Sequence, residues 1–310
     1  MRWTRRPRSR NLEDRRGERG SGRRFPFPRG GGGRAGGGRI PIPRGPGGKI
    51  SIGGLALVLG LVWLMGGDVF QVLGDAALQS GVPTGGAVPG SSPGAAPRSS
   101  PEEDERVDFV SFVLDDLQET WPRLLPDYRD ARLVLFRDAI DSGCGYAAAQ
   151  MGPFYCPGDE KVYIDLAFFE ELDQRFGAPG DFAQAYVLAH EVGHHIQKVT
   201  GVEPQVRRAQ QQSPSRKNEL SVRMELQADC LAGVWGHSAA QRDLLDPGDV
   251  EEGLGAAAAI GDDRLQKMAT GSVQPEGFTH GSSDQRVKWF RLGLESGDPA
   301  RCDTFEVARP

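Results

Sequence analysis

The 310-residue sequence has little cysteine and, in its first hundred residues, little from which a core could be built. It has four cysteines and no C-x-x-C pair, which excludes zinc ribbons and related sites that need clustered thiolates. The first hundred residues are rich in glycine, proline and arginine, with few large apolar side chains outside one run. Such a segment cannot bury enough surface to offset its ordering entropy. The chain is therefore expected to hold one sizeable globular domain plus appendages.

Acidic residues are scarce at the N-terminal end. Residues 1–49 contain fifteen Lys or Arg and three acids, a charge of +12. Since the net charge of the whole sequence is −5, residues 50–310 carry −17. An arginine-rich and glycine-rich tail could bind nucleic acid or anionic lipid headgroups. Because such a segment also fixes membrane orientation, we interpret residues 1–49 as a disordered cytoplasmic tail and do not expect nucleic acid as a partner.

One apolar run interrupts the N-terminal third of the chain. Eighteen uncharged residues, ISIGGLALVLGLVWLMGG, lie between Lys49 and Asp68. As a helix they would extend roughly 27 Å, close to the hydrocarbon thickness of a bilayer. We predict one transmembrane helix over residues 50–70, in contact with lipid through residues 50–67, with the rest of the chain outside the cytoplasm. A cleaved signal peptide is the alternative, but a long tail precedes the run and no clean A-x-A site follows.

A linker and one folded domain are expected after the apolar run. Residues 71–105 are dominated by Gly, Pro, Ser and Ala and predict a flexible linker, so the domain should occupy residues 106–310. Periodicity and capping signals predict helices over 107–125, from Asp181 to Gly201, from Ser213 to about Trp235, from Asp246 and from Ser282, with strands over 132–137 and 161–166. This pattern predicts a mostly helical α+β fold with a small sheet, whose strand at 162–166 could be an edge that pairs with a peptide.

The four cysteines all follow the predicted membrane segment. An even number in an oxidising compartment suggests disulfides. Cys144 and Cys156 would close a short loop rich in glycine and aromatics, and Cys230 with Cys302 would then tie the C-terminal tail to a central helix. Four independent buried thiols are the alternative.

The segment His190-Glu191-Val192-Gly193-His194 matches the HExxH pattern. On a helix, residues i and i+4 share one face, so His190 and His194 could bind one metal ion through their imidazoles. Glu191 would then lie beside the open coordination position, where it could accept a proton from water. The bare pattern also arises by chance, and two ordinary histidines are the alternative.

A catalytic zinc site needs a third protein ligand. The extended pattern HExxHxxGxxH would supply a third histidine, but Gln197 and Thr200 occupy the corresponding positions. The next long helix contains Glu225 and Asp229, four residues apart in ELQAD. One carboxylate of such a pair can bind zinc while the other orients a ligand imidazole. An exposed helix acid is the alternative for Glu225.

HEVGHHIQ followed by ELQADCLAGVW resembles the neutral zinc metallopeptidase family typified by YpfJ. It is more distantly similar to the gluzincin peptidases, which pair HExxH with E-x-x-x-D. The resemblance covers about two-thirds of the chain and implies a zincin-like domain. It also implies one Zn²⁺ per chain bound by His190, His194 and Glu225. Glu191 would be the general base and Asp229 the partner of His190.

The segment THGSSDQR near the C-terminus resembles a gluzincin segment that places a histidine and an arginine beside the substrate carbonyl. By this resemblance, His280 and Arg286 would donate hydrogen bonds to the oxyanion. In the alternative interpretation both are ordinary loop or helix-start residues.

The sequence therefore predicts a single-pass membrane-anchored zinc peptidase that acts on a peptide or protein outside the cytoplasm. The alternative is a non-catalytic exported zinc-binding interaction module. A structural zinc site is usually closed by four ligands, and the sequence offers no evident fourth.

Overall fold

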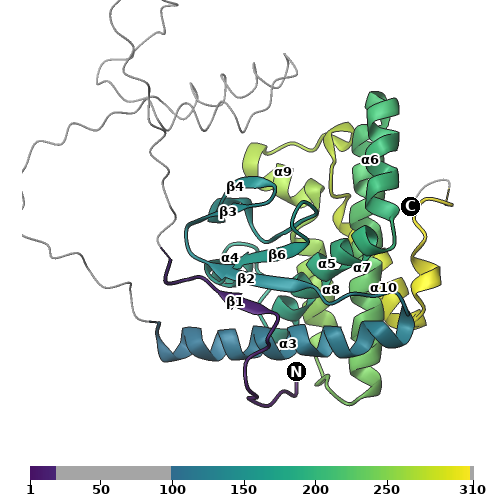
Figure 1. Ribbon diagram of the computed structural model, residues 1–310. Coiled ribbons are helices and arrows are strands. Elements are labelled where there is room, and N and C mark those ends of the chain that lie inside the picture. The colour runs from purple at the N-terminus through teal and green to yellow at the C-terminus, as the bar shows by residue number, and fades with distance from the viewer. Residues whose placement is uncertain (19–98, 308–310) are drawn as a thin grey trace, which may run out of the picture. The chain divides into compact units, whose positions relative to one another are not determined.

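The computed structural model describes residues 1–18 and 99–307 (Figure 1). The helices are α3 (Pro101–Leu124), α4 (Ala167–Gln174), α5 (Asp181–Val199), α6 (Val202–Gln212), α7 (Lys217–Gln241), α8 (Asp249–Ala259), α9 (Asp262–Thr270) and α10 (Ser283–Ser296). The strands are β1 (Leu12–Asp14), β2 (Arg132–Phe136), β3 (Ala139–Ser142), β4 (Gly145–Ala148), β5 (Phe154–Cys156) and β6 (Lys161–Asp165). The described part is thus mostly helical with little sheet, as the sequence predicts.

A four-stranded sheet has the order β1-β2-β6-β5. Strands β1, β2 and β6 run parallel, and β5 pairs antiparallel with β6. The prediction of an edge strand at residues 162–166 is wrong, because β6 lies between β2 and β5 with both of its sides paired. Among the described residues, the edge strands of this sheet are β1 and β5, three residues each, and neither was predicted from the sequence.

The sheet is buried on both faces. Leu133 and Leu135 of β2 pack into the main core with α3 and α5, whereas Val134 and Phe136 pack into a second cluster with the β3–β4 hairpin. Side chains alternate across a strand, so a run of consecutive apolar residues fits only a strand covered on both sides. The run RLVLF is therefore a central strand.

The first 18 residues belong to the folded unit. Leu12–Asp14 pair in parallel with β2, and the Ser9 amide donates to the Ser111 hydroxyl of α3 at 2.7 Å. The predicted disordered tail is therefore wrong for residues 1–18, and the domain resumes at Pro101 rather than at residue 106. The composition of residues 1–49 as a whole obscured a short strand flanked by arginines that pair with acids of α3.

The predicted membrane helix at residues 50–70 and most of the linker lie outside the described residues. None of the helices in the described part of the chain has both the length and the apolar character needed to cross a bilayer.

Three helices pack closely around the HExxH segment. An added Cβ at Gly193 of α5 would lie 3.0 Å from the Ala228 backbone of α7, and one at Gly293 of α10 would lie 1.9 Å from the Cys230 carbonyl oxygen of α7. Both glycines thus permit backbone approach that a side chain would prevent. The disulfides Cys144–Cys156 and Cys230–Cys302 are both formed, as predicted.

The helix starts predicted at Asp181 and Ser282 are confirmed, whereas α3, α7 and α8 begin at Pro101, Lys217 and Asp249 rather than at residues 107, 213 and 246. Ser282 caps α10 in a capping box with Gln285, as predicted. Helix α5 begins at Asp181, but its N-cap is Gly180 and the Asp181 carboxylate instead accepts from the amino group of Met1 at 2.8 Å. Helices α4, α6 and α9 were not predicted.

Candidate metal centre

Helix α5 carries the HExxH segment through the interior of the domain. Its apolar residues surround the segment, and Val187, Leu188 and Val192 are at most 4% exposed. His190 is 5% exposed and Glu191 7%. The imidazoles of His190 and His194 lie side by side, with ring centroids 4.8 Å apart, as the i, i+4 spacing predicts.

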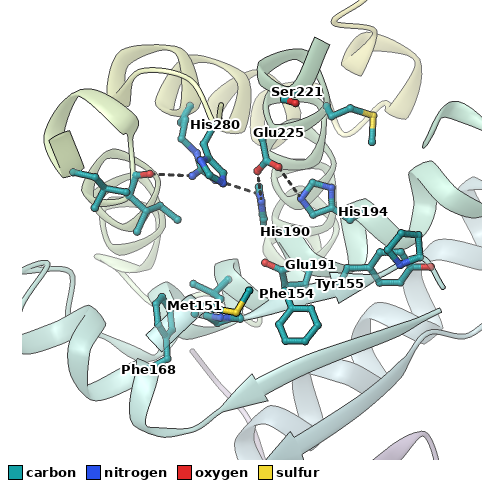
Figure 2. Close-up of a pocket in the computed structure, with 18 of the residues that line it drawn as sticks. Met151, Phe154, Tyr155, Phe168, His190, Glu191, His194, Ser221, Glu225 and His280 are labelled. Carbon is teal, nitrogen blue, oxygen red and sulfur yellow. Dashed lines mark hydrogen bonds and ion pairs between the residues drawn. The ribbon is translucent and has the colours of Figure 1, made fainter. Parts of the chain in front are cut away.

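Helix α7 brings Glu225 to the two imidazoles (Figure 2). Its Oε2 lies 3.2 Å from His190 Nε2, and its Oε1 lies 3.5 Å from His194 Nε2. The contact depends on the close packing of α5 on α7 at Gly193. Three residues that the sequence analysis nominated as metal ligands therefore converge from two helices.

The three side chains fit one metal ion. Their ligand atoms all lie within 4.8 Å of one another. Zinc bonds of about 2.0–2.1 Å with tetrahedral geometry separate neighbouring donors by about 3.4 Å, close to the two distances above. Two imidazole nitrogens and a carboxylate oxygen are also donors that zinc prefers. Within the described residues, no fourth Cys, His, Asp or Glu joins this group.

A buried carboxylate orients His190. Asp229, fully buried on α7, lies with Oδ1 2.8 Å from His190 Nδ1 and accepts from the Tyr186 hydroxyl at 2.5 Å. A carboxylate only accepts, so His190 Nδ1 carries a proton. In the neutral imidazole the lone pair is then on Nε2, which faces Glu225. Two lone pairs that face each other repel unless a proton or a cation lies between them.

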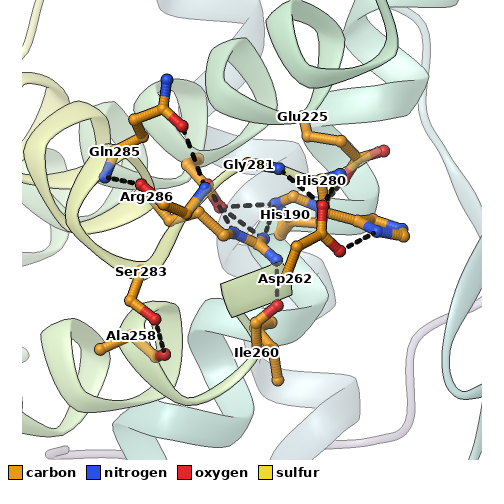
Figure 3. A network of polar contacts seen from close by, with 12 residues as sticks. His190, Glu225, Ala258, Ile260, Asp262, His280, Gly281, Ser283, Gln285 and Arg286 are labelled. Carbon is orange, nitrogen blue, oxygen red and sulfur yellow. Dashed lines mark hydrogen bonds and ion pairs between the residues drawn. The ribbon is translucent and has the colours of Figure 1, made fainter. Parts of the chain in front are cut away.

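Arg286 of α10 completes this network. Its Nε and Nη2 donate to the two oxygens of Asp229 at 2.8 and 2.9 Å, and its Nη1 donates to the Ile260 carbonyl at 3.2 Å (Figure 3). Arg286 as a whole is 2% exposed. Arg286 lines the cleft, but its side-chain contacts are with Asp229, the Tyr186 hydroxyl, His190 Nδ1 and the Ile260 carbonyl.

The charges of these groups shift their pKa values in the metal-free chain. Burial lowers the pKa of His190, but the charge and hydrogen bond of Asp229 outweigh it and raise the value to about 9. Burial would raise the pKa of Glu225, but the two imidazoles hold it well below its usual range. The site therefore attracts positive charge, and a metal ion would compete with protons for it.

A second carboxylate fixes the loop that carries His280. Asp262, the first residue of α9, accepts the backbone N–H groups of Thr279, His280 and Gly281 at 2.6, 2.6 and 3.1 Å. Its Oδ1 also lies 3.2 Å from His280 Nδ1. The His280 side chain is 51% exposed and lines the same cleft as Glu225. The loop is thus held at the cleft with the His280 imidazole half exposed.

Comparison with known proteins gives the chain a family. Residues 1–305 match the family described as "Putative neutral zinc metallopeptidase". The chain belongs to this family. It is 46% identical to "Uncharacterized protein YpfJ" of Escherichia coli (strain K12), over 98% of this chain and 99% of that protein. It is 45% identical to "Uncharacterized protein Mb2605" of Mycobacterium bovis and to "Uncharacterized protein Rv2575" of Mycobacterium tuberculosis, over 61% of this chain and 67% of each relative. No solved structure gives a significant match.

The cleft of this family member has a volume of about 890 Å³. Glu191 projects into it beside the imidazoles (Figure 2). Its apolar lining residues include Met151, Phe168, Phe176, Val187, Ile260 and Leu265. Its polar and charged lining residues include Glu171, Arg175, Glu203, Arg207, Gln210 and Ser221. Strand β5 contributes Phe154 and Tyr155, so the edge of the sheet forms part of the cleft.

Three supporting residues were not identified from the sequence. Tyr186 lies one turn before His190, Gln197 lies three residues after His194, and Asp262 opens a helix that was not predicted. Tyr186 and Gln197 could have been found from their helical spacing to the histidines, because each shares a face with one of them. The sequence around Asp262 gives no comparable signal. The predicted catalytic roles of Glu191, His280 and Arg286 stay predictions.

Proposed function

We propose that this protein is a zinc-dependent peptidase of zincin-like architecture that hydrolyses peptide bonds. The observation that carries the proposal is the approach of Glu225 to both imidazole nitrogens across two helices. His190, His194 and Glu225 would hold the zinc ion. Membership of the metallopeptidase family supports the same metal and the same class of reaction.

The proposed chemistry assigns each side chain one task. Zinc, when bound, lowers the pKa of water and polarises the scissile carbonyl. Glu191 accepts the proton of the attacking water and delivers it to the leaving amine. His280 donates a hydrogen bond to the developing oxyanion from the opposite wall. Arg286 holds Asp229 and, through it, His190, a task that its buried contacts favour over a direct contact with substrate.

The cleft supports an extended peptide as the substrate. Strand β5 is antiparallel to β6 and contributes to the cleft lining, so a peptide could add through main-chain hydrogen bonds to the side of β5 with which no described strand pairs. This assignment replaces the predicted pairing at residues 162–166. The apolar lining residues, among them Met151, Phe168 and Phe176, would accommodate a large apolar side chain of the substrate.

A non-catalytic zinc-binding module is the second candidate. A structural site is usually closed by four protein ligands, whereas the group of donors in the described chain numbers three and opens into a large cleft. A glutamate directly beside the open position is also superfluous in a structural site. These observations favour catalysis.

The deciding experiment compares Glu191→Gln with Glu251→Gln, an exposed glutamate of α8 outside the cleft. Purified protein should contain one zinc per chain, and chelation should abolish cleavage of a quenched-fluorescence peptide library. Glu191→Gln should retain zinc and lose turnover, while Glu251→Gln should retain both. Equal cleavage by the wild type and Glu191→Gln would refute the assignment. Zinc binding without any cleavage would favour the structural module.

We also infer that the folded domain, including residues 1–18, lies outside the cytoplasm. Two disulfides support this, because such bonds are rare in reducing compartments. Since β1 is hydrogen-bonded to β2, a single crossing by residues 50–67 would separate paired strands. We therefore drop the cytoplasmic N-terminus from the proposal. A single crossing by residues 50–67 is dropped with it, and contact of these residues with lipid stays a prediction.

Membrane-impermeant maleimide labelling tests this location. The exposed positions Thr4→Cys and Ser215→Cys flank the undescribed segment. Both should be labelled in intact cells or spheroplasts. Labelling of only Ser215→Cys would restore the predicted single-pass topology, and labelling of neither would place the domain in the cytoplasm.

A further inference from the structure

We propose that Gln197 is a positioning residue that fixes the tautomer of His194 through a chain of side-chain amides. The inference rests on the proposed function only in taking His194 as a metal ligand. Gln197 is fully buried on α5, and its Oε1 lies 2.9 Å from His194 Nδ1. An imidazole beside an amide can either donate or accept, so this contact alone leaves the proton unplaced.

Two backbone carbonyls remove the ambiguity. The Gln197 side-chain NH₂ donates to the Met224 carbonyl at 2.7 Å and to Gln227 Oε1 at 3.1 Å. The NH₂ of Gln227 in turn donates to the Cys302 carbonyl at 3.1 Å. Carbonyl oxygens can only accept, so each amide must direct its NH₂ away from His194.

The direction of this chain determines where the His194 proton lies. With its NH₂ on Met224 and Gln227, Gln197 can present only its oxygen to His194. His194 Nδ1 must then carry the proton, which leaves the lone pair on Nε2, the nitrogen that faces Glu225. The opposite tautomer would place two acceptors 2.9 Å apart in a buried site, which is costly.

The hydrogen-bonded side-chain amides also link the two metal-binding helices. Met224 directly precedes Glu225 on α7, so the same glutamine that orients His194 is attached beside the third ligand. The hydrogen-bonded series of amides ends at the Cys302 carbonyl, and Cys302 is joined to α7 by its disulfide with Cys230. The orientation of a ligand on α5 is thus set by the backbone of α7 and of the C-terminal segment.

The test replaces Gln197 by methionine, which keeps the volume and removes both amide groups. Loss of such a supporting partner typically weakens metal binding by about 10- to 100-fold, and we expect this for zinc affinity measured against a competing chelator. The matched control is Gln118→Met, because Gln118 is also a buried glutamine bound to a backbone carbonyl, but on α3 beside Ala131. It should lose stability while its zinc affinity stays that of the wild type.

Long-range ¹H–¹⁵N spectra of the histidine rings give a readout that does not depend on activity. At alkaline pH, where imidazoles are neutral, metal-free wild type should show His194 protonated on Nδ1. Gln197→Met should shift the ring toward the Nε2-protonated form. Gln197→Glu should retain the wild-type tautomer, because a carboxylate can accept from Nδ1–H.

Three results would overturn the inference: His194 protonated on Nε2 in the wild type, an unchanged tautomer in Gln197→Met, or zinc bound as tightly by Gln197→Met as by the wild type. Failure of the wild type to bind zinc would instead refute the proposed function. The spectra of the metal-free protein would still decide the role of Gln197.

Discussion

Substitution of Asp229 by alanine should be among the most damaging single changes in this protein. The carboxylate is fully buried and accepts from Arg286, Tyr186 and His190. Its removal leaves the guanidinium of Arg286, a residue only 2% exposed, without its counter-charge. Breaking a buried pair in this way costs about 3–5 kcal/mol, a large part of the 5–15 kcal/mol that stabilises a typical domain.

Urea unfolding of the metal-free protein, followed by circular dichroism, measures this cost. The double variant Asp229→Ala with Arg286→Met removes both charges, so it should be destabilised by less than the sum of the single variants. As a control, Glu18→Ala breaks the more exposed Arg15–Glu18 pair and should cost at most about 1 kcal/mol. Should Asp229→Ala cost no more than Glu18→Ala, the buried network would not exist as described.

Three further predictions concern packing, the N-terminus and pH. Gly293→Ala should lower the free energy of unfolding in urea by about 3 kcal/mol, because its Cβ would meet a backbone oxygen. Gly255→Ala is the control: its Cβ would enter open space beside α8, so it should be neutral or stabilising by up to about 1 kcal/mol. Equal effects of the two substitutions would contradict the close helix contact. Deletion of residues 1–18 should uncover the side of β2 that β1 pairs with, lower the urea midpoint and increase light scattering, whereas an unchanged midpoint would mean that β1 is not part of the sheet. Burial lowers the pKa of His280, but Asp262 and Glu225 raise it above its ordinary 6.5. The stability that His280 contributes to the metal-free protein, measured against His280→Gln, should therefore be complete below about pH 6.5 and lost at higher pH. A contribution that grows with pH would contradict this prediction.

The predictable part of the fold is the part fixed by local pattern. The HExxH spacing places two imidazoles on one face of any helix, and Ser282 with Gln285 specifies a helix start that needs no tertiary information. The strand predicted at residues 132–137 likewise rests on a local signal, the apolar run Leu133–Phe136. In each case the signal and the structure it specifies lie within a few residues of one another.

The part that escaped prediction depends on partners distant in sequence. Strand β1 has only three residues, and it exists because β2, 120 residues later, offers an unpaired side. Average composition over residues 1–49 cannot reveal such a pairing. The role of Arg286 was likewise assigned by resemblance, whereas its contacts depend on how α10 packs on α7. Sequence patterns identify the residue types of a site better than they identify which atom each one contacts.

The two histidines are oriented by different kinds of partner, and the local charge gives a reason. His190 is hydrogen-bonded to a carboxylate, Asp229, whose charge is balanced by Arg286. His194 is hydrogen-bonded to the neutral amide of Gln197. The charges left uncompensated are then the carboxylates of Glu225 and Glu191, two negative charges that one Zn²⁺ would balance. A carboxylate at position 197 would add a third negative charge without a nearby guanidinium among the contacts described. An amide fixes the tautomer without that charge, provided that its own direction is set, as the Met224 and Cys302 carbonyls do here.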